Sequence, residues 1–303
     1  MLVPLSRIGA PRRNWRLAVA AASAQRLPCG SQLRRPTIVT SPSGSVLYGQ
    51  DGGVATITLN RPESMNSLDT EAKEALLGAL REAAEDPEVR AVILTGRGRG
   101  FCVGQDLKEH IELIRTDDPA PLRTVAEHYN PIVMTIAGMP KPVIAAVNGM
   151  AAGAGASFAF AADFRIAGAS AKFLMAFAKI GLSVDSGATW TLPRLIGHGK
   201  AAELMLLAQP VDAVTALDLG MVTQVVPDEE LQQRAAGFAA ELAAGPTLAY
   251  AAIKAALAFS AGNDLAASLA NEGEHMAGTG LSEDHRAAVR AFVDKTAPTF
   301  TGR

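Results

Sequence analysis

Residues 143–163, VIAAVNGMAAGAGASFAFAAD, constrain the fold of this chain more than any other segment. An apolar run ends at Asn148-Gly149, a stretch of almost only glycine and alanine follows, and a second apolar run ends at Asp163. The pattern predicts a buried strand, a tight turn and the start of a helix with few side chains in the way. Backbone N–H groups are exposed at such a turn, where the helix dipole is positive, so the turn can bind an anionic oxygen.

A second glycine-opened turn lies earlier in the chain. The apolar run AVILTG (91–96) predicts a strand buried on both faces, and RGRGFCVGQDLKE (97–109) follows it. If N–H donors from the two turns converge on one carbonyl oxygen, they form an oxyanion hole, which stabilises the negative charge that develops during the reaction. The function therefore depends on whether the two turns meet in space.

The composition indicates a globular protein with a large core. The chain has 303 residues, of which 49% are hydrophobic and 19% charged, enough for one or two domains. The net charge of −2 argues against nucleic acid as the main partner. No run of 18 strongly apolar residues occurs. The nearest to one, 143–162, is rich in glycine and alanine, so we expect a core segment and no membrane span.

Cysteine and histidine give no sign of a disulfide or a metal site. Cys29 and Cys102 are the only cysteines, and neither lies in a CxxC pair. Cys102 could be a nucleophile beside its glycine turn, but a small buried apolar residue is the favoured interpretation. The histidines have no metal-ligand spacing, so surface roles are expected for His110, His128, His198, His275 and His285.

The N-terminal segment differs from the rest of the chain. Residues 1–50 contain seven arginines and no lysine, aspartate or glutamate, and serine is frequent. This composition is typical of an organelle transit peptide, and a disordered leader or an upstream start in a bacterial gene is an equal alternative. We therefore exclude residues 1–44 from the fold and expect either the bacterial cytoplasm or the mitochondrial matrix as the location.

Hydrophobic periodicity predicts an α/β core over 45–240 followed by a helical region over 241–303. A Gly-Gly turn inside 46–60 predicts a β-hairpin. Strands are expected over 89–95, 143–147, 164–168 and 221–227, and helices over 68–85, 107–138 (broken near 117–119), 153–162, 200–208, 213–219, 229–244, 247–259, 265–277 and 282–295.

The chain resembles the crotonase (enoyl-CoA hydratase/isomerase) superfamily in five ordered segments. These are ITLNRPESMNSL (57–68), AVILTGRGRGFCVGQDLKE (91–109), KPVIAAVNGMAAGAG (141–155), FLMAFAKIGLSVDSGATWTLPRLIG (173–197) and KTAPTFTGR (295–303). The resemblance implies a spiral of ββα turns with a helical C-terminal trimerisation region, and a homotrimer or a dimer of trimers. It also implies an acyl-CoA thioester substrate, with coenzyme A as part of the substrate and no separate cofactor or metal.

By this resemblance, the oxyanion-hole N–H groups are those of Val103 and Ala154. Gly104, Gly153 and Gly155 shape the two turns and lie beside the substrate. A thioester carbonyl held by two N–H groups forms an enolate readily, so that a side-chain base can remove the Cα proton.

The acidic residues of the superfamily separate its reactions. Enoyl-CoA hydratases resemble one another in carrying two glutamates, which position a water molecule and deliver its proton to the substrate. This chain has Ser157 at the first of these positions and Phe177 at the second. Without either carboxylate no obvious group activates water, which argues against a conventional hydratase.

One carboxylate remains in the expected neighbourhood, that of Asp185. The surrounding pattern and the terminal APTFTGR are similar to those of ring-1,2-epoxyphenylacetyl-CoA isomerases and, in mechanism, of Δ3-Δ2 enoyl-CoA isomerases. The chain departs from that pattern at Val184, where proline is usual, and at Ala188, where glycine is usual. The resemblance implies that Asp185 is the catalytic base; from the residues alone, a solvated loop aspartate or the N-cap of a helix beginning near Thr189 is the alternative.

Further residues are candidates for substrate binding. Phe177 and Trp190 either line the acyl pocket, where they would raise the pKa of Asp185, or pack in the core. Asp106 and Lys108 follow the first turn, where the pantetheine and adenine should pass, and Lys108 either binds the CoA phosphates or is a solvated surface residue. By family analogy, two residues of the C-terminal helices reach the CoA of a neighbouring subunit, namely Phe259 and Lys295.

The prediction is therefore an acyl-CoA isomerase that acts through an enolate stabilised by an oxyanion hole. The reaction is a double-bond shift or a ring-epoxide rearrangement. One alternative is a hydratase that uses a non-standard acid or base. A second alternative is a non-catalytic scaffold that binds acyl-CoA or associates with RNA.

Overall fold

The computed structural model describes residues 37–40 and 44–303. The leader expected over 1–44 therefore lies almost entirely outside the described residues. The chain divides into two units, residues 1–35 and 36–303, and the description below concerns the second unit.

A seven-stranded sheet forms the centre of this unit, with the strand order β1-β2-β3-β4-β6-β8-β11. β1, β2 and β3 pair antiparallel, and the remaining neighbours pair parallel. The strands are β1 (Thr37–Thr40), β2 (Val46–Asp51), β3 (Val54–Leu59), β4 (Ala91–Gly96), β6 (Val143–Val147), β8 (Phe164–Gly168) and β11 (Gln224–Val226). The predicted hairpin and the fully buried strand at 89–95 are confirmed.

A second, smaller sheet has the order β10-β9-β7-β5. Its strands are β5 (Gly100–Cys102), β7 (Met150–Ala152), β9 (Lys172–Leu174) and β10 (Val211–Asp212). β5, β7 and β9 each follow one strand of the large sheet, and they pair parallel with one another. A strand of the large sheet, a short strand of the small sheet and a helix thus form a repeating ββα unit, which confirms the predicted spiral.

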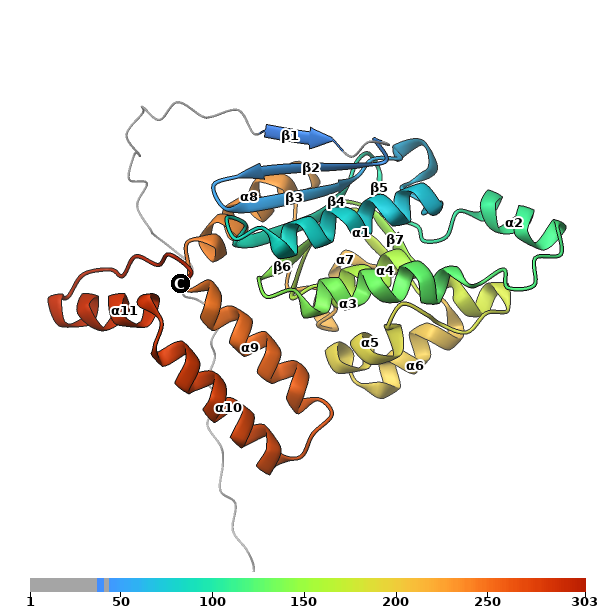
Figure 1. The fold of residues 1–303 in the computed structure, drawn as a ribbon. Coiled ribbons are helices and arrows are strands. Elements are labelled where there is room, and N and C mark those ends of the chain that lie inside the picture. The colour runs from blue at the N-terminus through green and yellow to red at the C-terminus, as the bar shows by residue number, and fades with distance from the viewer. Residues whose placement is uncertain (1–36, 41–43) are drawn as a thin grey trace, which may run out of the picture. The chain divides into compact units, whose positions relative to one another are not determined.

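Helices cover both faces of the large sheet (Figure 1). Side chains alternate along β4, so that Val92 and Leu94 join the main core while Ala91 and Ile93 face α8 (Leu231–Ala243). The main core also receives α1 (Thr70–Glu85), α3 (Asn130–Gly138) and α4 (Ala154–Ala161). The other elements of the core unit are η1 (Pro62–Ser64), α2 (Leu107–Arg115), the π-helical turn η2 (Val125–Tyr129), η3 (Ala176–Ile180), α5 (Ala188–Ile196), α6 (His198–Leu207), α7 (Ala213–Asp218) and η4 (Asp228–Glu230).

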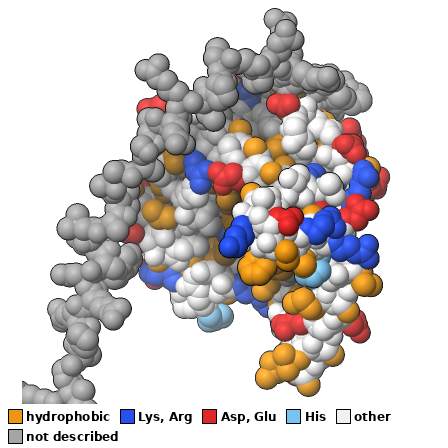
Figure 2. Space-filling view, turned by 90° about the vertical axis from the view of Figure 1, so that its left-hand side faces the viewer, with side chains coloured by type: hydrophobic (Ala, Val, Ile, Leu, Met, Phe, Trp, Pro, Cys, Tyr) orange, Lys and Arg blue, Asp and Glu red, His pale blue; other side chains and the backbone are white. Residues whose placement is uncertain are grey.

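The last three helices lie beside these layers (Figure 1). They are α9 (Thr247–Ser260), α10 (Leu265–Gly280) and α11 (Glu283–Asp294), and α9 packs on α10. Figure 2 views this side and shows hydrophobic side chains among the charged ones. The exposed apolar residues of α9 and α10 include Ile253, Leu257, Leu265, Leu269 and Met276. A surface of this kind is typical of an interaction face, and its predicted role in trimerisation stays a prediction, as does the boundary at 240/241.

The final residues of the chain fold back onto the sheet and onto α11. Arg90, directly before β4, donates a hydrogen bond to the carbonyl oxygen of Phe300 at 3.0 Å. Asp284, in the first turn of α11 and only 3% exposed, accepts hydrogen bonds from the N–H groups of Thr301 at 2.6 Å and Gly302 at 3.0 Å. The segment KTAPTFTGR therefore closes the helical region against the core.

No single helix among residues 44–303 is long and apolar enough to cross a membrane. Two consecutive helical segments, Asp228–Ala243 and Thr247–Ser260, are together long and apolar enough by length and composition alone, but a bend of 99° separates them.

Candidate active site

A cavity of about 460 Å³ lies where the two glycine turns meet, between the small sheet, α2 and the loop before α5. Its lining is mostly apolar, as in small-molecule binding sites generally. Eight of the predicted site residues line it, namely Val103, Gly104, Asp106, Lys108, Gly153, Ala154, Phe177 and Asp185.

The two turns are in direct contact. β5 and β7 pair side by side, so each turn begins at the same edge of the small sheet. Gly104 has a φ of +84°, and a Cβ on it would lie 3.3 Å from the Ala154 nitrogen. A Cβ on Gly155 would lie 2.2 Å from the carbonyl oxygen of Cys102. Only glycine permits this approach, because any side chain would push the turns apart. Gly155 thus shapes the wall from behind and does not line the cavity.

Two backbone donors at this contact are free. Within residues 44–303, neither the Val103 nor the Ala154 amide has a hydrogen-bond acceptor in the protein. Ala154 is the first residue of α4, and its N-cap, Gly153, offers no side chain to the helix. The positive end of the helix dipole and two unpaired N–H groups therefore adjoin one cavity, an arrangement that can bind a carbonyl or enolate oxygen.

The segment before α1 holds the first turn in place. The N–H of Leu68 donates to the Gly104 oxygen at 2.8 Å, and the N–H of Asp106 donates to the Leu68 oxygen at 3.1 Å. Asn66 is 1% exposed and has a left-handed backbone with φ +58°. Its side-chain nitrogen donates to the carbonyl oxygens of Gly100 at 2.8 Å and Phe101 at 3.2 Å. The 57–68 segment thus positions the 91–109 segment.

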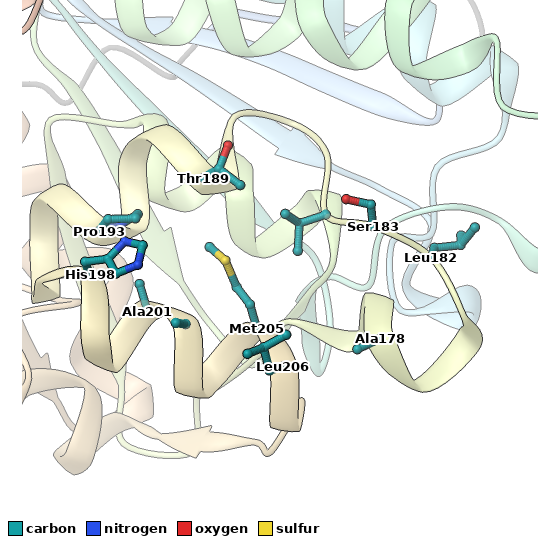
Figure 3. A pocket seen from close by; sticks show the side chains of 11 residues that line it. Ala178, Leu182, Ser183, Thr189, Pro193, His198, Ala201, Met205 and Leu206 are labelled. Atoms are coloured by element: carbon teal, nitrogen blue, oxygen red, sulfur yellow. The ribbon is translucent and has the colours of Figure 1, made fainter.

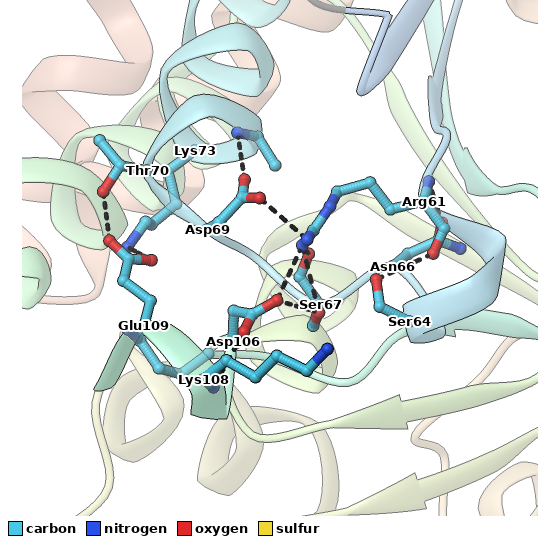
Figure 4. A network of polar contacts seen from close by, with 12 residues as sticks. Arg61, Ser64, Asn66, Ser67, Asp69, Thr70, Lys73, Asp106, Lys108 and Glu109 are labelled. Atoms are coloured by element: carbon cyan, nitrogen blue, oxygen red, sulfur yellow. Dashed lines mark hydrogen bonds and ion pairs between the residues drawn. The ribbon is translucent and has the colours of Figure 1, made fainter. Parts of the chain in front are cut away.

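Asp106 is committed to this scaffold. It is 8% exposed, and Oδ1 accepts from the Lys108 N–H while Oδ2 accepts from Ser67 Oγ and Arg61 Nη1 (Figure 4). Burial on its own would raise the pKa of Asp106, but the hydrogen bonds from Ser67 and Arg61 hold it below its usual value. The Asp106 side chain therefore caps α2, and its predicted contact with the substrate stays a prediction. Lys108 lines the cavity with an exposed side chain, and its binding to CoA phosphates also stays a prediction.

Asp185 is the other carboxylate of the cavity lining. Burial raises the pKa of Asp185, and a hydrogen bond from Ser186 Oγ at 2.7 Å partly opposes this. The N-cap of α5 is Gly187, with no side-chain cap, so the alternative role of Asp185 as an N-cap is wrong. Ser186 and Gly187 have φ values of +53° and +72°, a left-handed pair that turns the chain sharply beside the carboxylate.

The positions of the two missing glutamates differ in their surroundings. Ser157 is fully buried in α4, and its hydroxyl donates to the Gly153 oxygen at 3.2 Å. Phe177 does line the cavity, and its ring lies 3.7 Å from the Cβ that Gly153 would carry. Neither residue offers a carboxylate. Asp185 is therefore the one carboxylate of the described cavity lining that the scaffold leaves largely free.

Several predicted residues lie outside the cavity lining. Trp190 is 49% exposed on α5 and stacks with the Arg194 guanidinium, 3.3 Å from the ring centroid, so it neither lines this cavity nor packs in the core. Phe259 and Lys295 lie in or directly after the C-terminal helices, and their contact with a neighbouring subunit stays a prediction. The Cys102 thiol is fully buried, and burial raises its pKa to about 12, which is incompatible with a role as nucleophile.

The fold agrees with the comparisons with known proteins. Residues 49–303 match the family model described as enoyl-CoA hydratase/isomerase. The chain belongs to this family. A 1,2-epoxyphenylacetyl-CoA isomerase of Escherichia coli (strain K12) is 44% identical over 260 residues, which is 85% of this chain and 98% of that protein.

Other relatives within the hydratase/isomerase family carry a different activity in their names. A "Probable enoyl-CoA hydratase" of Rhodobacter capsulatus is 43% identical over 260 residues, covering 86% of this chain and 98% of that protein. The crystal structure of an enoyl-CoA hydratase from Polaromonas sp. JS666 matches with a TM-score of 0.80 at 33% identity, covering 84% of this chain and 99% of that one. The family is therefore established, while the names of similar proteins include both reactions.

The structure of this hydratase/isomerase adds cavity residues that the sequence did not single out. Tyr129 is 2% exposed, and its hydroxyl donates to Gln105 Oε1. Burial, followed by nearby ionisable groups that include Asp185, raises the pKa of Tyr129, so the phenol stays neutral. The lining further includes Ser67 and Leu182. Ser67 and Leu182 lie within two of the matching segments and Tyr129 lies between two others, but membership of such a segment does not indicate the direction of a side chain.

A second cavity of about 330 Å³ lies behind the loop that carries Asp185 (Figure 3). Leu182 lines both cavities, whereas Val184 lines only the second and Asp185 only the first. The loop is therefore a thin wall between them. Val184 contributes an apolar side chain to the second cavity.

Proposed function

We propose that this family member is an acyl-CoA isomerase. The N–H groups of Val103 and Ala154 bind the thioester oxygen, and Asp185 carries the proton. The observation that supports this most directly is that Asp185 is the one uncommitted carboxylate of a cavity that also holds two free N–H donors.

The proposed steps balance with one base and no further reactant. With a 3-enoyl thioester, the Asp185 carboxylate removes a proton from C2, and the electron pair moves into the thioester carbonyl to give a dienolate. The two N–H groups stabilise the negative oxygen. The carboxylic acid then returns its proton to C4, and the double bond lies between C2 and C3. A raised pKa suits Asp185 to both accepting and returning the proton.

The proposal also covers the acyl group, the cofactors, the assembly and the location of the protein. The acyl group is either a linear enoyl chain or a ring-epoxide that rearranges, and the resemblance to epoxyphenylacetyl-CoA isomerase supports the second. No metal or redox cofactor takes part, and the assembly is a homotrimer or a dimer of trimers. We place the protein in the bacterial cytoplasm, because the relatives named above are bacterial and give no support to the mitochondrial alternative.

A hydratase is the second candidate, and the name of the Rhodobacter relative favours it. Such an enzyme would have to position water without a glutamate at Ser157 or Phe177. Asp185 and a polar lining residue such as Gln105 would then have to share that role. A non-catalytic scaffold would not need two unpaired N–H groups in an apolar cavity, which makes it the weaker alternative.

The experiment that separates the candidates is mass spectrometry of the product formed by the full chain in H₂¹⁸O. A 3-enoyl-CoA and a 2-enoyl-CoA are each supplied. An isomerase converts the 3-enoyl thioester to the 2-enoyl thioester without ¹⁸O. Uptake of ¹⁸O would identify a hydratase, and binding without conversion would identify a scaffold.

A further inference from the structure

Arg61 joins the N-termini of two helices that flank the first turn of the site (Figure 4). Its guanidinium donates to Asp69 Oδ2 at 2.9 Å and to Asp106 Oδ2 at 3.1 Å. Asp69 is the N-cap of α1, and Asp106 is the N-cap of α2. The same guanidinium donates to the carbonyl oxygen of Ser67 at 2.5 Å. A single cation therefore ties together two helix caps and the segment that leads into α1.

Ser67 and the next residue carry this connection to the turn. Ser67 Oγ donates to Asp106 Oδ2 at 2.9 Å, so Ser67 and Asp106, which both accept hydrogen bonds from Arg61, also contact each other. Leu68 pairs with the turn through hydrogen bonds to Gly104 and Asp106 at 2.8 and 3.1 Å. The turn from Val103 to Asp106 is thus held at both ends by a segment that Arg61 fixes.

We infer that Arg61 is a positioning residue for the N–H group of Val103. Arg61 is not among the described residues that line the cavity, so it acts through Asp106 and Ser67 and does not touch the substrate. Without the guanidinium, the carboxylates of Asp69 and Asp106 lose the cation they share and repel each other. Asp106 is nearly buried, so the N-terminus of α2 and the adjoining turn move to separate the two charges.

The inference rests on the proposed oxyanion role of Val103 and Ala154. A displacement of about 1 Å in a catalytic group lowers a rate by roughly 100-fold, so a small movement of this turn is enough to affect turnover. Binding of the CoA moiety depends on other contacts and should change little. The expected signature is therefore a fall in kcat at nearly constant KM.

The test uses the full chain and butyryl-CoA labelled with ¹³C at the thioester carbonyl. This ligand has no double bond to move, and the ¹³C shift of the bound carbonyl reports its polarisation by the two N–H groups. Variants R61Q and R61K are compared with the control R97Q. That control also removes a guanidinium group, but one that only donates a hydrogen bond to Asn60 on the surface. Affinity is measured by calorimetry, and kcat and KM are measured with 3-enoyl-CoA.

We expect R61Q to lose most of the downfield shift that binding causes in the unchanged protein. Its kcat should fall roughly 10- to 100-fold while the affinity for butyryl-CoA stays within about threefold. R61K should be intermediate, because an ammonium group supplies the charge but not the planar fork that reaches three acceptors. R97Q should match the unchanged protein in every measurement.

The remaining outcomes each support or overturn the positioning role of Arg61. An unaltered carbonyl shift in R61Q overturns the inference whatever the activity. A bound-state shift that depends on Arg61 in a protein without isomerase activity supports the inference and refutes the proposed function. If the unchanged protein shows no shift on binding, the oxyanion hole itself is wrong and both fall. If R61Q does not fold, S67A and R61K carry the test, and normal shifts in both overturn the inference.

Discussion

The amide nitrogen of Ala154 lies 3.3 Å from the point that a Cβ on Gly104 would occupy. These residues are far apart in the sequence, and their approach brings the two free N–H groups to one cavity. The same point lies 3.1 Å from the carbonyl oxygen of Ala152, so a methyl group there has no room without movement of backbone. This contact makes the geometry of the site testable by a single methyl group.

We expect Gly104→Ala to reduce isomerase kcat/KM by at least about 100-fold, comparable to the loss of an oxyanion-hole donor. Alanine at φ +84° is strained, and its methyl group separates the two turns. Gly78→Ala is the matched control, because a Cβ at Gly78, within α1, meets nothing within 4 Å. Gly78→Ala should keep full activity and gain about 0.5–1 kcal/mol of unfolding free energy. Equal activity of both variants would contradict the assigned contact.

Asp185→Asn should lower isomerase turnover roughly 10²- to 10⁴-fold, because the amide cannot carry the proton. The affinity for a saturated acyl-CoA, measured by calorimetry, should not change. Burial raises the pKa of Asp185, so ionisation is unfavourable in the folded state and its removal should not reduce stability at neutral pH. An active Asp185→Asn protein would refute the role of this residue.

The pH dependence of kcat/KM should have an acid limb that is displaced upward. Asp185 must be ionised to accept a proton, and its pKa is raised, so activity should be lost at a pH above the ordinary range of an aspartate. The folding stability changes in the opposite direction. Because the pKa of Asp185 is higher in the folded than in the unfolded protein, the contribution of Asp185 to the free energy of unfolding is present at low pH and is lost as the pH rises through the pKa of the folded state. Initial rates between about pH 4 and 8 measure the limb. A midpoint at or below the ordinary aspartate pKa would exclude Asp185 as the base.

Lys254→Met should destabilise the protein by an amount on the order of 2–3 kcal/mol, because it leaves a mostly buried carboxylate without its cation. Lys254 Nζ lies 2.6 Å from Asp163 Oδ2 and thereby fastens α9 to the start of β8. Burial raises the pKa of Asp163 and lowers that of Lys254, and the pairing opposes both shifts. Urea unfolding measures the change, with Lys200→Met, from an exposed pair with Glu203, as a control expected to cost less than about 0.5 kcal/mol.

Addition of Asp163→Asn to Lys254→Met should restore part of this stability, because the unpaired charge is then gone. If the double variant is no more stable than Lys254→Met, the destabilisation comes from lost packing of the lysine stem and not from the charge.

The sequence was sufficient for the elements that carry a long pattern. The buried run before Gly96, the amphipathic helix that Asp69 caps and the Gly/Ala segment around Ala154 were all predicted close to their observed bounds. In each case the signal lies within one chain segment: a continuous apolar run, a helical spacing of apolar residues, or a Gly/Ala stretch after a strand. The ordered motifs then identified the family, and with it the two turns and Asp185.

The short strands were not predictable in the same way. β5, β7 and β9 have three residues each, too few to show alternation, and each pairs with a segment far away in the sequence. The direction of Trp190 was missed for a related reason, because its place on the outer side of α5 depends on what α5 packs against. The role of Arg61 depends on three acceptors brought together only by the fold, and a sequence motif does not reveal such partners.

The closing of the C-terminal tail on Arg90 has a consequence for synthesis of the protein. Besides Phe300, the Arg90 guanidinium donates to the carbonyl oxygen of Gly245 and to Thr247 Oγ1 at 2.9 Å. These acceptors all leave the ribosome more than half a chain length after Arg90 itself. The Arg90 guanidinium can therefore reach its first two acceptors only after residues 245–247 are made, and its full set of partners is complete only when Phe300 has been added.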